Sequence, residues 1–118
     1  LAAATTLDLD EVVELVHTAG GIAIAAHVDR KAFSVYSQLG LFPTNAGFDG
    51  IEVSRQLASD SPRLEEFEAL GLPLTSSSDA HFLEDIGTAA AELQMTEPTF
   101  AELVLALARS GDRSVARA

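Results

Sequence analysis

Cysteine is absent from this chain, and basic residues are scarce. Without cysteine there can be no disulfide and no thiolate metal ligand, which suits a cytoplasmic protein. Only 7 lysines and arginines stand against 18 aspartates and glutamates, so the formal net charge is −11. Because an acidic surface repels phosphate backbones, we expect no general nucleic-acid surface. A phosphorylated substrate would need a local cation, from a metal ion or from arginines.

Long apolar runs are missing as well. The longest, Ala19–Ala26, is far shorter than the ~20 residues that span a bilayer, and no basic segment precedes Leu1–Ala4 as in a signal peptide. We therefore expect no membrane partner. The chain of 118 residues is long enough for a single domain with one core. Residues 112–118 are small and polar, and we expect them to form a flexible tail.

Glycine and proline divide the chain into alternating helices and strands. Apolar spacing predicts helices from Leu9 to just before Gly20, with Asp8 as N-cap, and over residues 31–39, 62–70 and 98–110. Strands are predicted at 21–26, 50–54 and 72–76, and residues 88–93 fit either a fourth strand or a helix. This alternation predicts an α/β fold with a parallel sheet, either open or part of a barrel.

Polar side chains stand where these strands end. His27 follows the first strand, Asp79 and His81 follow the third, and Glu52 lies within the strand between them. In parallel α/β folds the loops after the strands line the active site, so we expect these residues on one face. Asp79 and His81 are two residues apart and point the same way in an extended segment. Imidazole with carboxylate oxygen suits Zn²⁺, Mn²⁺ or Fe²⁺.

Each of these residues also has a plainer interpretation. His27 could be a polar loop residue, and residues 78–81 could form a simple turn or a helix cap. Glu52 could instead pair with Arg30 or Arg55. The joint occurrence of Asp, Glu and His at successive strand ends nevertheless favours a metal site.

Basic residues follow the same strand ends. Arg30, Lys31 and Arg55 could hold a phosphate, with Arg30 the first candidate because a guanidinium binds phosphate in a bidentate way. They could equally be solvated charges. His17, near the end of the first helix, is interpreted as structural, because a cation suits the helix dipole there.

Three segments resemble the later motifs of the PHP (polymerase and histidinol phosphatase) superfamily. They are GGIAIAAHVDR at 20–30, FDGIEVSR at 48–55 and LPLTSSSDAHFLEDIG at 72–87, so the resemblance covers about residues 10–93. It implies part of a distorted (β/α)₇ TIM-like barrel that holds up to three divalent ions, Mn, Zn or Fe. The implied activity is metal-dependent hydrolysis of a phosphate ester, carried by a phosphorylated small molecule or a nucleotide-like substrate.

The resemblance assigns roles to residues. His27 matches a late metal-binding histidine, and Asp79 and His81 match the final aspartate and histidine. Glu52 falls near the site as a further candidate ligand, while Arg30 would contact the substrate phosphate, with Arg55 as a second candidate. Many relatives have proline after the first of these histidines, whereas this chain has a valine, which alters the local turn.

The family's opening His-x-His motif does not occur among these residues. We therefore expect the chain to be the C-terminal portion of a PHP domain, completed by the remainder of that domain or by self-association. The parent protein would be a phosphoric-ester hydrolase, and activity of this chain alone stays open. The alternatives are a non-catalytic structural or regulatory fragment with an incomplete metal site, and another metallohydrolase of a related barrel, such as an amidohydrolase.

Overall fold

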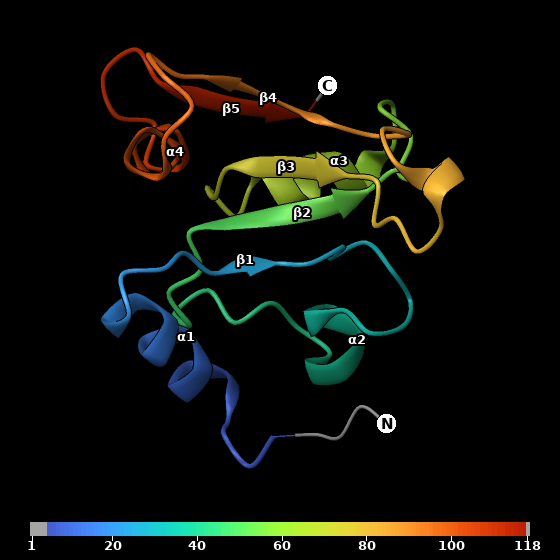
Figure 1. Cartoon of the computed structure of the whole chain (residues 1–118). Coiled ribbons are helices and arrows are strands. Elements are labelled where there is room, and N and C mark those ends of the chain that lie inside the picture. The colour runs from blue at the N-terminus through green and yellow to red at the C-terminus, as the bar shows by residue number, and fades with distance from the viewer. Residues whose placement is uncertain (1–4, 118) are drawn as a thin grey trace.

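The computed structural model describes residues 5–117 and combines two small sheets with four α-helices (Figure 1). The helices are α1 (Leu9–Thr18), α2 (Val35–Leu39), α3 (Pro62–Glu68) and α4 (Phe100–Leu107), with a short 3₁₀ helix, η1 (Leu83–Asp85). The strands are β1 (Ile24–Ala25), β2 (Gly50–Ser54), β3 (Leu74–Ser77), β4 (Ala91–Gln94) and β5 (Ser114–Arg117). No helix within the described part of the chain is both long and apolar enough to cross a bilayer.

The first three strands form the predicted parallel sheet, in the order β1-β2-β3. Its register aligns Ile24 with Gly50 and Glu52 with Thr75. The expectation of a parallel sheet is confirmed for these strands alone, because β4 and β5 pair antiparallel in a second sheet. The parallel sheet is not closed, so the described residues do not form a barrel.

The C-terminal segment is the clearest correction to the sequence-based expectation. Residues 114–117 were expected to be part of a flexible tail, but they form β5 and align with β4 from Ala91↔Arg117 to Gln94↔Ser114. Pairing with β4 satisfies the backbone N–H and C=O groups on one edge of this segment, and Val115 is buried. Ala118 lies outside the described residues. The fourth strand also begins three residues later than Thr88, the start that was predicted.

Several other elements are shorter than predicted. The predicted strand at 21–26 pairs only at Ile24–Ala25, and the helix expected over 31–39 begins at Val35, where Ser34 forms a capping box with Ser37. The last helix spans Phe100–Leu107 rather than 98–110. The first helix agrees with the prediction: Asp8 accepts a hydrogen bond from the Glu11 N–H, and Gly20 just beyond its end has φ 76°.

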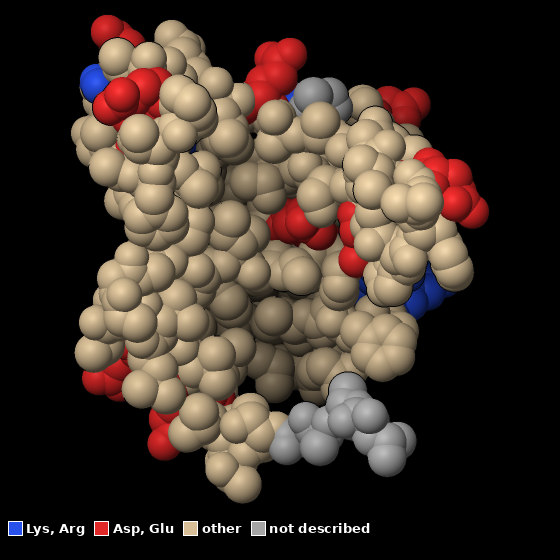
Figure 2. All heavy atoms as spheres, viewed as in Figure 1, with Lys and Arg blue, Asp and Glu red and all other residues tan. Residues whose placement is uncertain are grey.

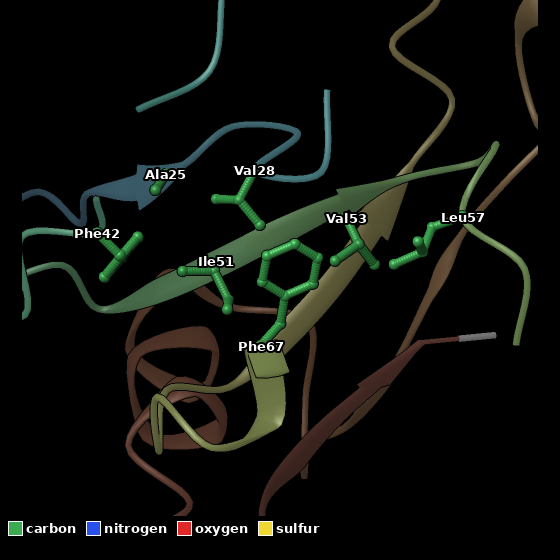
Figure 3. Packing of buried hydrophobic residues seen from close by; sticks show 7 residues of the cluster. All are labelled: Ala25, Val28, Phe42, Ile51, Val53, Leu57 and Phe67. Carbon is green, nitrogen blue, oxygen red and sulfur yellow. The ribbon is translucent and has the colours of Figure 1, made fainter. Parts of the chain in front are cut away.

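The main core lies between the parallel sheet and α3 (Figure 3). Ile51 and Val53 of β2 are 0% exposed, and Phe67 of α3 is 2% exposed. Because neighbouring residues of a strand point to opposite faces, Glu52 points away from this core. Seen from the side drawn in Figure 2, the molecule is hollowed, and acidic side chains lie inside the hollow. The alternation of side chains along β2 thus places the apolar core on one face of the sheet and Glu52 on the other.

Candidate functional site

The turn after β1 is held against β2 by both backbone and side-chain hydrogen bonds. The chain leaves the extended conformation at His27, whose φ is 31°, yet the Val28 N–H still donates to the Glu52 carbonyl oxygen at 2.8 Å. One residue on, Asp29 Oδ1 accepts from the Ser54 N–H at 2.6 Å and Oδ2 accepts from the Ser54 hydroxyl at 2.5 Å. The Asp29 carboxylate thus continues the hydrogen bonding to β2 beyond the point where β1 has ended.

Glu52 ties the same turn to the third strand. Its Oε1 accepts from the His27 N–H at 3.3 Å, and its Oε2 accepts from the Ser77 hydroxyl at 2.6 Å. The ion pairs considered for Glu52 from the sequence do not form, because Arg30 and Arg55 contact other carboxylates. In this structure Glu52 is a bridge that orients the backbone at His27.

Asp79 follows β3 in a left-handed conformation, with φ 48°. Its Oδ2 lies 2.5 Å from Arg30 Nη1, which brings the end of β3 and the turn after β1 together. His81 Nδ1 lies 2.8 Å from the backbone carbonyl oxygen of Asp79. Because a carbonyl can only accept, Nδ1 carries the proton in this bond, and Nε2 is the ring nitrogen that remains for a metal ion or a ligand.

The loop that carries Asp79 and His81 is fixed by several further hydrogen bonds. Asp85 Oδ1 accepts from Arg55 Nη2 at 3.0 Å, while Arg55 Nη1 donates to Thr88 Oγ1 at 2.7 Å. The hydrogen bond from Arg55 lowers the pKa of Asp85, and the N–H groups of residues 81 and 82 act in the same direction. At the base of the loop, the Ser78 hydroxyl accepts from the Gly87 N–H at 3.0 Å. Charge and backbone contacts hold this loop in place.

Four of the six residues to which the resemblance assigns roles line one pocket of about 160 Å³: Arg30, Arg55, Asp79 and His81. The other lining residues are Ser54, Gln56, Ser78 and Asp85. His27 and Glu52 do not line it. Two guanidinium groups face two carboxylates here, so the fixed charges of the pocket largely compensate one another.

The predicted metal ligands meet the requirements of a metal site only in part. His27 Nδ1 is buried and has no hydrogen-bond partner, a state that metal ligation would relieve. Within residues 5–117, however, no three side chains of the His, Asp and Glu type converge closely enough to hold an ion. The described residues therefore do not build a complete metal centre by themselves.

His17 lies apart from this region. Its Nε2 is 2.8 Å from Asp49 Oδ2, and the same oxygen accepts from the Ala23 N–H at 2.7 Å. The contact joins the last turn of α1 to the segments that enter β1 and β2. This geometry agrees with the structural role expected for His17.

The residues that join the strand ends were not predicted from the sequence. Asp29, Ser54 and Asp85 carry most of these contacts, and Asp29 and Ser54 are 9% and 5% exposed. The sequence carried no signal for this pair, although each pocket arginine directly follows one of its members, in Asp29-Arg30 and Ser54-Arg55.

Comparison with known proteins bears on the C-terminal part of the chain. The family model described as PHP-associated matches residues 64–110, which run from α3 to just beyond α4. Over these residues the match confirms the resemblance to the C-terminal region of the PHP superfamily, and the matched segment contains Asp79 and His81. The resembling segments at 20–30 and 48–55 lie outside the match. No curated protein and no solved structure matches the chain.

Proposed function

We propose that this chain supplies the phosphate-binding residues and the late metal ligands of a PHP-type metal-dependent phosphoesterase. One observation carries the proposal: two arginines, an aspartate and a histidine that follow three neighbouring strands line a single pocket. The PHP-associated match of residues 64–110 supports the same assignment. The substrate would be a phosphate ester of a small molecule or a nucleotide-like compound.

The arginines would bind the phosphate. Arg30 uses Nη1 for Asp79, which leaves its other N–H groups for a ligand. Arg55 uses one N–H of each terminal nitrogen for Thr88 and Asp85, which leaves its Nε–H and the second N–H of each terminal nitrogen. Because both guanidinium groups are held by carboxylates on one side, they are oriented before a ligand arrives, and this lowers the entropic cost of binding.

His27, Asp79 and His81 are the residues that would hold a divalent ion, Mn, Zn or Fe, with Glu52 supporting His27. Such an ion, when bound, would lower the pKa of a coordinated water and polarise the phosphoryl group. The remaining ligands would come from the rest of a PHP domain or from a second copy of this chain. In that assembly the open sheet would form part of a distorted (β/α)₇ barrel.

A second candidate function is a non-catalytic structural or regulatory module. It is favoured by a specific observation, namely that the metal-ligating side chains of residues 5–117 do not form a group of three. In this alternative the ion pairs at the pocket only hold loops together.

Cation binding separates the two functions. We expect calorimetry with Mn²⁺ or Zn²⁺ to show saturable binding of about one ion, lost in an Asp79→Ala/His81→Ala double variant. Glu84→Ala is the matched control, because Glu84 is an exposed carboxylate of the same loop. No saturable binding to the wild-type chain, or equal loss in the control, would favour the non-catalytic module.

Phosphate binding is tested separately. Inorganic phosphate should bind wild-type protein more tightly than Arg30→Gln, because the variant loses a charge-assisted hydrogen bond of about 1.5–3 kcal/mol. Lys31→Gln removes the same charge from the adjacent residue and should leave the affinity close to wild type. Equal weakening in both variants would show that only general charge matters.

A further inference from the structure

Asp29 is a buried carboxylate that the proposed chemistry does not use. Its exposure is 9%, and its two oxygens accept from one residue, Ser54, at 2.6 and 2.5 Å. A buried carboxylate is costly to desolvate and persists only where donors satisfy it. Among the described residues, the side chain of Asp29 has no basic partner, since Arg63 donates to its backbone oxygen instead. The position therefore calls for an explanation beyond charge pairing.

The location of this contact suggests what it does. Asp29 and Ser54 stand immediately before Arg30 and Arg55, the two arginines of the pocket. The Arg30 backbone is held on both sides, because its N–H donates to the His27 carbonyl at 2.9 Å and its own carbonyl accepts from the Ser34 hydroxyl at 2.8 Å. The Arg30 backbone is thus fixed at one end of the bridge, and Arg55 directly follows Ser54 at the other end. The bridge therefore sets the distance between the two arginine backbones, while the ion pairs with Asp79 and Asp85 orient the guanidinium groups.

Ser54 extends the same bridge toward the pocket. Its hydroxyl donates to Asp29 and accepts from the Gln56 N–H at 3.3 Å, and both Ser54 and Gln56 line the pocket. Removing the Asp29 charge would therefore loosen the turn after β1 and the end of β2 together.

We propose that Asp29 is a positioning residue: its carboxylate, through Ser54, sets the spacing of Arg30 and Arg55 so that both contact one tetrahedral oxyanion. The inference rests on the proposed phosphate-binding function, because a fixed spacing matters only if one ligand meets both arginines. It gives the pocket a chemical preference for a terminal phosphate group. If the contact between Asp29 and Ser54 only stabilised the fold, its loss would not change the environment of the two guanidinium groups.

Nuclear magnetic resonance of the arginine side chains tests the positioning directly. In ligand-free protein, Asp29→Asn should shift the Nε–Hε resonances of both Arg30 and Arg55, although neither residue is substituted. Ser54→Ala removes the hydroxyl bonds to Asp29 and Gln56 but keeps the bond from the Ser54 N–H to Asp29, so it should shift these resonances less than Asp29→Asn. It also serves as the milder variant, which should stay folded should Asp29→Asn unfold. Glu102→Gln, which breaks an ion pair elsewhere, is the control and should lower the melting temperature without moving these resonances.

Titration with inorganic phosphate completes the experiment. We expect Asp29→Asn to weaken phosphate binding about tenfold, the loss of one charge-assisted contact, while Glu102→Gln binds as wild type does. Variants of Asp29 and Ser54 that lower the melting temperature but leave the arginine resonances unchanged would overturn the inference. If wild-type protein binds no phosphate, the proposed function fails, and the ligand-free spectra still decide whether Asp29 positions the arginines.

Discussion

Replacing Phe67 with alanine tests whether the core under β2 holds the site scaffold together. Phe67 is 2% exposed and packs from α3 into the cluster that contains Ile51 and Val53. Its ring centroid lies 5.8 Å from that of Tyr36, and the Arg63 guanidinium lies 5.3 Å from the ring centroid. The substitution would remove one of the two buried phenylalanine side chains of this core and the contacts that its ring makes.

The expected loss of stability is about 4 kcal/mol. Removing a buried phenylalanine side chain costs about 3–5 kcal/mol, because transfer and cavity terms add. The pair with Tyr36 is worth ~0.5–1.5 kcal/mol and the cation–π contact ~0.5–1 kcal/mol, and both overlap with the burial term. Since whole domains are stable by about 5–15 kcal/mol, the variant should approach the limit of folding.

Urea unfolding, followed by far-UV circular dichroism, would measure this loss as a lower midpoint at an unchanged slope. Phe82→Ala is the matched control, because Phe82 is 69% exposed and should lose less than about 0.5 kcal/mol. Phe67→Leu keeps most of the volume and should cost about 1.5 kcal/mol. A loss below about 1 kcal/mol for Phe67→Ala, or equal losses at the two phenylalanines, would refute the packing argument.

Three further predictions concern pH, backbone conformation and association. Hydrogen bonds from Arg113 and from the Thr96 N–H hold the pKa of Glu102 at about 2, so its stabilising effect is complete above pH 4.5 and is lost as the pH falls toward 2; the difference in Tm between wild type and Glu102→Gln should shrink over that interval, and a constant difference would contradict this. Gly40 has φ 76° and no neighbouring atom within 4 Å of an added Cβ, so Gly40→Ala should cost about 1–2 kcal/mol from backbone strain alone, as chemical denaturation would show. The chain should self-associate through its open sheet and exposed apolar side chains, such as Leu83, which is 85% exposed; a monomer in sedimentation velocity with a cooperative melt would count against this.

Local signals in the sequence predicted most of the regular elements. Alternation of apolar segments with glycine punctuation indicated β2 with both its boundaries, and Asp8 with Gly20 marked the ends of the first helix. These features depend on neighbouring residues, so they can be recognised without the fold. The strand β5 could not, because its partner lies about 20 residues earlier and the segment itself is short and polar.

The candidate site was likewise predictable from the sequence only in part. The sequence placed four candidate residues just after predicted strands, which predicted that they lie close together. The structure confirms this for all four, which line one pocket: Arg30, Arg55, Asp79 and His81. The partners within that pocket were not predictable. Arg30 contacts Asp79 across 49 residues and Arg55 contacts Asp85 across 30, and such pairs depend on how the loops cross.

What the sequence determined by itself is the parallel βαβ order and the kind of residue that follows each strand, because backbone periodicity and chain polarity are local properties. Tertiary structure alone decided that Glu52 supports His27, that Asp29 joins Ser54, and that the last strand pairs with β4. Those outcomes depend on which donors and acceptors meet when the strands are aligned. A buried polar atom takes whichever partner the packing brings within about 3 Å, however distant that partner is along the chain.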